Sequence, residues 1–145
     1  MKFLIINGPN LNLLGLREPA IYGSKDYNAL ISFIKTSCDA LGIECETYQS
    51  NHEGAIVDKI QEAYGVFDGI VINPAAYTHT SVAIHDALKA VSIPTVEVHL
   101  SDINSREEFR RHSFVSPIAV KTICGLGFDG YKEAIIHLKN HLENS

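Results

Sequence analysis

Short apolar runs alternate with longer segments of helical period along this chain. Five runs have strand length: Lys2 to Asn7, Ile43 to Tyr48, Gly69 to Asn73, Thr95 to His99 and Val120 to Cys124. Between the runs, apolar residues recur at steps of three and four, as in the stripe Tyr27, Leu30, Ile31, Ile34, Cys38 and Leu41. This alternation is typical of a parallel sheet that is covered by helices on both faces.

The pattern predicts an α/β chain with a flavodoxin-like three-layer fold. We expect a five-stranded parallel sheet in the order 2-1-3-4-5, because right-handed crossovers favour that arrangement. Helices are expected from about Lys25, with Ser24 as N-cap, from Ser50 onward, and from Asp129 to Leu142, with a short one within residues 105–111. A chain of 145 residues can bury one core, so residues 1–145 are expected to form a single catalytic domain.

The charge balance limits the partners that such a chain can bind. It has 12 basic and 17 acidic residues, a net charge of -5, and no block rich in Lys or Arg. Nucleic acid and anionic membrane are therefore not expected as partners. The apolar run from Met1 to Ile6 is too short for a signal-peptide core or a membrane span, which predicts a cytoplasmic protein. The cysteines lack a Cys-x-x-Cys pair, which favours reduced thiols at Cys38, Cys45 and Cys124.

Polar side chains gather after the strands of the predicted sheet. In open parallel sheets, ligands bind beyond the carboxyl ends of the strands, near the switch between the first and third strands. The residues expected at this edge are Asn10, Arg17 and Tyr22 after the first strand, Asn73, Thr78, His79 and Thr80 after the third, and His99, Ser101 and Arg110 beyond the fourth. Neutral and cationic hydrogen-bonding groups on one edge predict a small-molecule site for a polyol or a carboxylate.

The stretch from Gly8 to Gly23 joins the first strand to a helix by an unusually long connection. Such connections typically run about 2 to 6 residues, and long ordered loops are commonly binding loops. Arg17 and Tyr22 both lie in this stretch, and a guanidinium near a phenol lowers the pKa of that phenol. The pair is therefore a candidate for base chemistry, although each residue alone is more often a solvated charge or a packed ring.

The sequence motifs do not point to a cofactor or a metal. A Gly-x-Gly-x-x-Gly run at residues 125–130 matches a dinucleotide fingerprint, but no second strand follows to carry the ribose-binding acid. His137 and His141 are spaced for one helix face but lack a third ligand nearby. A flavin carrier needs a Ser/Thr-rich loop after the first strand, and a phosphorylated receiver needs Asp where Asn73 stands. Residue types alone leave open an enzyme and a binding protein of this fold, which a turnover assay separates.

Four sequence blocks carry a resemblance to a known family. They are Asn7 to Asn12, Arg17 to Gly23, Asn73 to Ser81 and Glu97 to Ser101. With these blocks in order, the chain resembles the type II 3-dehydroquinate dehydratases over its whole length. The resemblance implies loss of water from 3-dehydroquinate to give 3-dehydroshikimate, by anti elimination through an enolate and without metal, cofactor or Schiff base. It also implies trimers that group into a homododecamer, and a role in the shikimate pathway of aromatic amino acid biosynthesis or in quinate catabolism.

The resemblance also assigns catalytic roles within these blocks. Tyr22 is the expected base that removes a proton beside the ketone, and Arg17 is the cation that lets this phenol ionise. Asn10 is expected to help hold a water that stabilises the enolate. His99 is expected to protonate the departing hydroxyl, and Glu97 supports its imidazolium from the same face of the strand.

Substrate-binding roles follow from the same resemblance. They fall on Asn73 for the carboxylate and hydroxyl region, on the amides of Leu100 and Ser101 for the carboxylate, on His79 and Arg110 for ring hydroxyls, and on Asp86 for a neighbouring subunit's site. The chain departs from the family's usual pattern at Ala75, where Gly is common, and at Asp102 and Asn104, where Asn and His are common. None of these replaces a proposed catalytic group, so the departures are expected to act on substrate affinity.

Overall fold

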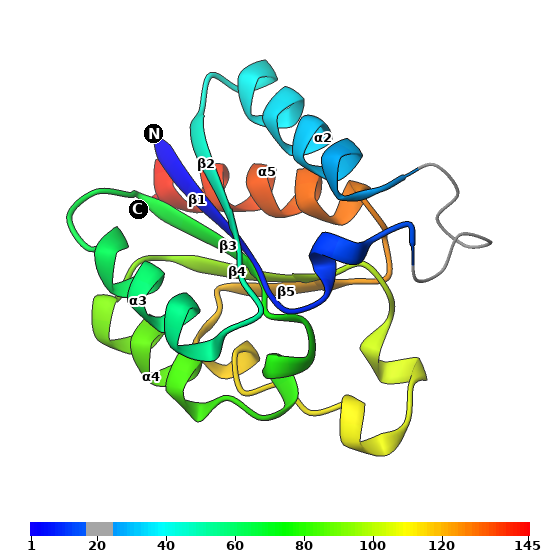
Figure 1. Cartoon of the computed structure of the whole chain (residues 1–145). Coiled ribbons are helices and arrows are strands. Elements are labelled where there is room, and N and C mark those ends of the chain that lie inside the picture. The colour runs from blue at the N-terminus through cyan, green and yellow to red at the C-terminus, as the bar shows by residue number, and fades with distance from the viewer. Residues whose placement is uncertain (17–24) are drawn as a thin grey trace.

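The computed structural model describes residues 1–16 and 25–145 (Figure 1). Its strands are β1 (Lys2–Asn7), β2 (Glu44–Gln49), β3 (Gly69–Asn73), β4 (Thr95–His99) and β5 (Lys121–Cys124). Its helices are α2 (Tyr27–Ala40), α3 (Glu53–Ala63), α4 (Val82–Val91) and α5 (Asp129–Glu143). The predictions made for Arg17, Tyr22 and Ser24 fall outside the described residues.

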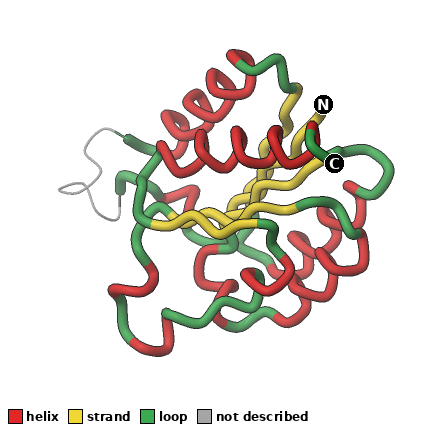
Figure 2. Tube along the Cα trace, turned by 180° about the vertical axis from the view of Figure 1, so that it is seen from behind, coloured by secondary structure: helices red, strands yellow, loops and turns green. Residues whose placement is uncertain are grey.

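The strands form one parallel sheet in the order β2-β1-β3-β4-β5, which confirms the predicted topology. Figures 1 and 2 show α2 and α5 on one face of the sheet and α3 and α4 on the other, so the three predicted layers are confirmed as well. The central strands β3 and β4 are buried along their whole length, as strands covered on both faces must be.

Two hydrophobic clusters fill the spaces between the layers. Phe3 and Ile5 of β1 pack towards α2 and α5, whereas Leu4 and Ile6 point the opposite way and pack towards α3 and α4. Successive strand residues face opposite sides of the sheet, so one apolar strand supplies both clusters. Each fully buried side chain of this kind contributes roughly 1.5–3 kcal/mol of transfer free energy.

The strand register brings the connecting segments to one edge of the sheet. Asn7 pairs with Asn73, so β1 and β3 end at the same level. The segments that follow β1, β3 and β4 therefore begin side by side, and each opens with a single 3-10 turn: η1 (Leu11–Leu13), η2 (Ala75–His79) and η3 (Ile103–Ser105). This is the edge where the sequence predicts a ligand site.

Some predicted helix starts differ from the observed ones. Helix α2 begins two residues after its predicted start, with Asp26 as the N-cap, whose side chain accepts a hydrogen bond from the Ala29 amide. The short helix expected within residues 105–111 is instead the 3-10 turn η4 (Glu108–Arg110), which follows η3. The Asp102 carboxylate caps the start of η3 by accepting from the Asn104 amide, and Arg106 and Glu107 separate η3 from η4.

Candidate active site

A cavity of about 160 Å³ opens at the carboxyl edge of the sheet. The structure brings together at this cavity most of the residues predicted from sequence, namely Asn10, Asn73, His79, His99, Leu100, Ser101 and Arg110. They come from the segments after β1, β3 and β4, which are far apart in the chain. The parallel topology is thus the physical reason that these residues meet.

The segment after β1 is held against β2 by amide side chains. Asn10 has a positive φ of 70° and its backbone amide donates to Asn51 Oδ1 at 3.0 Å. Gln49 Nε2 donates to the Gly8 carbonyl at 3.1 Å and to Asn12 Oδ1 at 3.3 Å. A Cβ at Gly8 would lie 2.4 Å from the Pro74 carbonyl oxygen, so only glycine allows this approach to the end of β3. These contacts fix the wall of the cavity that carries Asn10.

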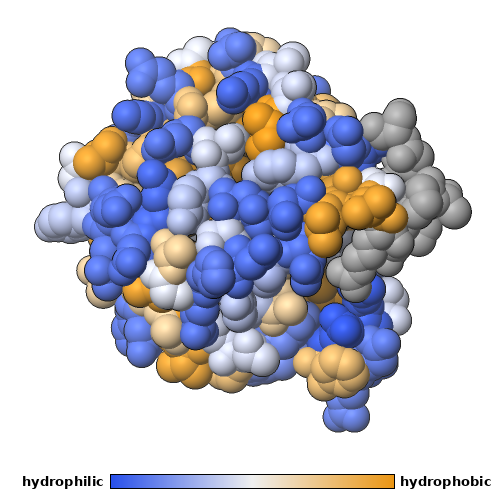
Figure 3. Space-filling view, in the orientation of Figure 1, coloured by the Kyte–Doolittle hydropathy of each residue, from blue (hydrophilic) through white to orange (hydrophobic). Residues whose placement is uncertain are grey.

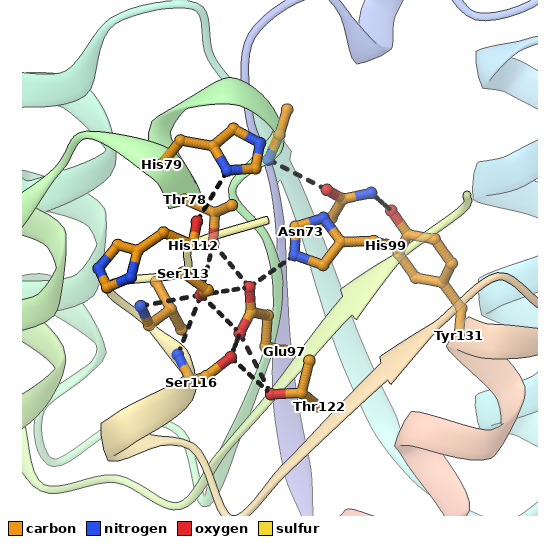
Figure 4. A network of polar contacts seen from close by, with 12 residues as sticks. Asn73, Thr78, His79, Glu97, His99, His112, Ser113, Ser116, Thr122 and Tyr131 are labelled. Atoms are coloured by element: carbon orange, nitrogen blue, oxygen red, sulfur yellow. Dashed lines mark hydrogen bonds and ion pairs between the residues drawn. The ribbon is translucent and has the colours of Figure 1, made fainter. Parts of the chain in front are cut away.

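Asn73 is oriented by a buried network that lies behind the cavity. Its Nδ2 donates to the Tyr131 hydroxyl at 3.0 Å, and its Oδ1 accepts from the Ala75 amide at 3.1 Å. The Tyr131 hydroxyl in turn donates to Asn7 Oδ1 at 2.7 Å. Burial raises the pKa of Tyr131, so the phenol stays protonated and can fill both the donor and the acceptor role. Figure 4 shows the Asn73 amide lying between Tyr131 and the region of His99.

Glu97 and His99 form a buried pair on β4. They are two residues apart on one strand, so their side chains share a face of the sheet. His99 Nε2 lies 2.5 Å from Glu97 Oε2, which leaves Nδ1 facing away from the carboxylate. His99 lines the cavity, whereas the Glu97 side chain is fully buried behind it. Burial alone raises the pKa of Glu97, but the hydrogen bond and charge of His99 and the hydrogen bonds from Thr78 and Ser116 outweigh it and hold the pKa at about 2.

The low pKa of Glu97 predicts a specific acid sensitivity. A pKa lowered in the folded state adds stability above the ordinary value of 4.5, and that stability is lost as the pH falls towards about 2. At about 1.4 kcal/mol per pKa unit, the loss is on the order of 3 kcal/mol. We expect Glu97→Gln to flatten the dependence of unfolding free energy on pH in this window, as measured by urea titrations. The exposed Glu44→Gln should keep the slope of the unchanged protein, and an equally steep slope in Glu97→Gln would contradict the expectation.

Two arginines and His79 add to the polar lining of the cavity. Arg106 and Arg110 both line it, and Arg110 Nε also pairs with Glu107 Oε2 at 3.0 Å. His79 Nδ1 lies 2.8 Å from the His112 carbonyl oxygen, so Nδ1 carries a proton and Nε2 is an acceptor while the ring is neutral. Guanidinium groups favour a carboxylate, and a free imidazole nitrogen can accept from a hydroxyl.

The sequence interpretation did not assign Arg106 or the leucines of η1 to the site. Leu11, Leu13 and Leu14 line the cavity together with Ile103. Leu13 is 43% exposed, and Figure 3 shows apolar surface beside the residues drawn in grey. The available signal for Arg106 was its spacing of four from Arg110, but Arg106 directly follows η3 and Arg110 ends η4, so the two do not share one helix.

Asp86 lies apart from this cavity. It is an exposed residue of α4 and is not among the cavity's lining residues. In this chain the position therefore has no contact with the site, and the role suggested for it concerns a second subunit. Within residues 1–16 and 25–145, no group of three or more His, Cys, Asp or Glu side chains is placed so that it could bind a metal ion. In the same part of the chain, every helix falls short of the length and apolarity needed to span a bilayer.

Comparison with known proteins identifies the family. The model of the family described as dehydroquinase class II matches residues 1–139. The chain belongs to the class II dehydroquinases. It is 56% identical over 142 residues to the catabolic 3-dehydroquinase of Verticillium alfalfae, covering 98% of this chain and 95% of that protein. It is also 56% identical over 142 residues to the 3-dehydroquinate dehydratase of Clostridium acetobutylicum, covering 98% and 99% of the two chains.

A solved class II dehydroquinase has the same fold. The crystal structure of the type II dehydroquinase from Butyrivibrio crossotus superimposes with a TM-score of 0.92 at 57% identity, covering 96% of this chain and 97% of that one. The flavodoxin-like fold and the family resemblance drawn from the sequence are therefore both confirmed.

Two departures from the usual class II dehydroquinase pattern have visible structural consequences. Ala75 takes a positive φ of 53°, a region that costs an L-residue about 1 kcal/mol and that glycine adopts without this cost. The Asp102 carboxylate accepts from the Asn104 amide at 2.9 Å and is not among the lining residues of the cavity. Its negative charge is thereby directed into the η3 turn and not at the site of an anionic ligand.

Proposed function

We propose that this chain removes water from 3-dehydroquinate to give 3-dehydroshikimate, by anti elimination through an enolate. Family membership and relatives that carry the name 3-dehydroquinate dehydratase support the hydro-lyase activity. The structural observation that carries the proposal is the cavity in which His99, backed by the buried carboxylate of Glu97, faces the same space as Arg106 and Arg110. That space offers an acid for a leaving hydroxyl beside guanidinium donors for the other oxygen groups of the substrate.

Each catalytic step has a proposed residue. Tyr22 removes the proton from the carbon beside the ketone, and Arg17 favours its ionised form. Asn10, at the cavity wall, helps hold a water that stabilises the developing enolate. His99 then gives a proton to the departing hydroxyl, which leaves as water. Proton movement and charge stabilisation supply the whole reaction, so we assign no step to a metal or cofactor.

Binding is proposed to use groups on three segments. The backbone amides of Leu100 and Ser101 bind the substrate carboxylate, and Asn73 contacts the carboxylate and hydroxyl region. His79 and Arg110 bind the ring hydroxyls. These residues line the cavity, which supports the assignment. Arg106 adds a second guanidinium close to the same space.

The test is a turnover assay with 3-dehydroquinate, followed by the absorbance of the enone product. We expect conversion that survives dialysis against a chelator, because no step needs a metal. A binding protein of the same fold would bind 3-dehydroquinate in calorimetry without converting it, and that result would refute the proposal.

The assembly, the location and the metabolic role are also proposals. We expect trimers grouped into a homododecamer, with Asp86 reaching a neighbouring subunit's site, and light scattering tests the mass. The exposure of Asp86 on α4 is compatible with such a contact. Three free cysteines support a cytoplasmic location. Relatives are named both as catabolic 3-dehydroquinase and as 3-dehydroquinate dehydratase, so both quinate catabolism and aromatic biosynthesis fit the proposed reaction.

A further inference from the structure

The Glu97 carboxylate is surrounded by hydroxyl groups that the proposed mechanism does not use. Thr78 Oγ1 donates to Oε2 at 2.6 Å, and Ser116 Oγ donates to Oε1 at 2.7 Å. Ser113 Oγ lies 3.0 and 2.8 Å from the two oxygens, and Thr122 Oγ1 lies 3.2 Å from Oε1. Figure 4 shows these contacts converging on Glu97, with His99 approaching on one side. Both carboxylate oxygens therefore have hydroxyl partners, and Oε2 also contacts the imidazole of His99.

Backbone amides fix the direction of one of these hydrogen bonds. Ser113 Oγ accepts from the Val115 amide at 3.1 Å and from the Ser116 amide at 3.1 Å. A hydroxyl has two lone pairs and one proton, so after these two bonds Ser113 can only donate. The proton of Ser113 therefore points towards the acceptors around it, of which the Glu97 oxygens are the charged ones. A carboxyl that carried its own proton would compete with this donor, so the arrangement favours the ionised form.

The four hydroxyls of Thr78, Ser113, Ser116 and Thr122 are here called the hydroxyl cage. Thr78 comes from η2, Ser113 from the segment before η5 (Ser116–Ile118), Ser116 from the start of η5, and Thr122 from β5, and none lines the cavity. The segments are tied together, since the Phe114 amide donates to the Thr78 carbonyl at 2.8 Å. The cage thus lies behind the cavity, on segments that are hydrogen-bonded to one another.

We propose that the hydroxyl cage holds Glu97 as a carboxylate in one orientation, so that the proton shared by Glu97 and His99 stays on the imidazole that faces the substrate. The cage members are positioning residues, because they act through Glu97 and do not touch the cavity. The inference rests on the proposed role of His99 as the acid. Without the cage, the proton moves towards the carboxyl, and a neutral imidazole is a far weaker acid for a leaving hydroxyl.

The charges around Glu97 are consistent with this assignment. Among the described residues, His99 on β4 and Cys124 on β5 are the titratable groups that face it. Burial first, and then the charge of Glu97, raise the pKa of Cys124, so its thiol stays neutral. The imidazolium is therefore the cation that compensates the buried carboxylate.

The test removes one cage donor from each carboxylate oxygen with the pair Thr78→Val and Ser116→Ala. Because donors to a charged group are the strong ones, we expect kcat to fall roughly 10-fold or more while KM changes little. Carbon NMR of the labelled Glu97 carboxyl should show ionisation at a higher pH than in the unchanged protein. The conservative variant Thr78→Ser keeps the hydroxyl, so it should show the kcat and the carboxyl signal of the unchanged protein.

The matched control is Thr95→Val. Thr95 is buried on the same strand as Glu97, but its hydroxyl donates to the Ile93 carbonyl at 2.9 Å, so we expect unchanged kcat and an unchanged Glu97 signal. An unchanged kcat in the Thr78 and Ser116 variants, or an unshifted carboxyl signal, contradicts the proposed role of the hydroxyl cage. If the double variant does not fold, Thr122→Val replaces it, with the same expected fall in kcat and the same shift of the Glu97 carboxyl signal. An unchanged protein that fails to turn over 3-dehydroquinate refutes the proposed function, whereas the carboxyl signal still decides whether the cage holds Glu97 ionised.

Discussion

His99→Gln is expected to lower kcat by roughly 10²–10⁴-fold, which is the contribution typical of a positioned general acid. The amide nitrogen of Gln can still donate towards Glu97, so the buried carboxylate keeps a hydrogen-bond partner. It carries no transferable proton, so the hydroxyl must leave without an acid. We expect KM to change by much less, because the cations and amides of the cavity remain. Steady-state rates from enone absorbance, with the fold checked by circular dichroism, measure both quantities.

The matched control for this variant is His141→Gln. His141 is an exposed residue near the end of α5, far in the chain from the cavity residues, so the same chemical change there should leave kcat unaltered. A His99→Gln enzyme with turnover within a few-fold of the unchanged protein would remove His99 from the proposed mechanism. If His99→Gln loses the circular dichroism signal of the folded protein, His99→Asn is measured in the same way to separate lost catalysis from lost folding.

The strands could be predicted well because burial determines them. β1, β3 and β4 have the predicted bounds, since each is an apolar run between polar residues and is covered on both faces. The edge strands are less completely buried: β2 is shifted by one residue at both ends, and β5 starts one residue later than predicted. For α3, the chain offers Ser50 and Asn51 as starts, but Asn51 Oδ1 is used by the Asn10 amide and the helix begins at Glu53.

The site could be predicted only where local sequence and topology meet. Residues that directly follow a strand, such as Asn73 and His99, are placed by the sheet, and the family resemblance gives them roles. The hydroxyl cage was not predictable in this way, because Ser116 and Thr122 reach Glu97 across 19 and 25 residues of sequence. Isolated Ser and Thr residues give no periodic signal, so only the three-dimensional structure reveals their common target.

Tyr22→Phe should abolish turnover, with kcat lowered by roughly 10²–10⁴-fold or more, because the substitution removes only the proton acceptor. Binding of 3-dehydroquinate, measured by calorimetry, should survive, since the ring and the cations remain. The matched control is Tyr77→Phe, whose hydroxyl donates to the Asn51 carbonyl at 2.7 Å and whose side chain does not line the cavity. That control should keep the kcat of the unchanged protein, and its free energy of unfolding should fall by only roughly 1 kcal/mol, the contribution of one hydrogen bond. Turnover close to that of the unchanged protein in Tyr22→Phe would eliminate residue 22 as the base, and another group would have to take the proton.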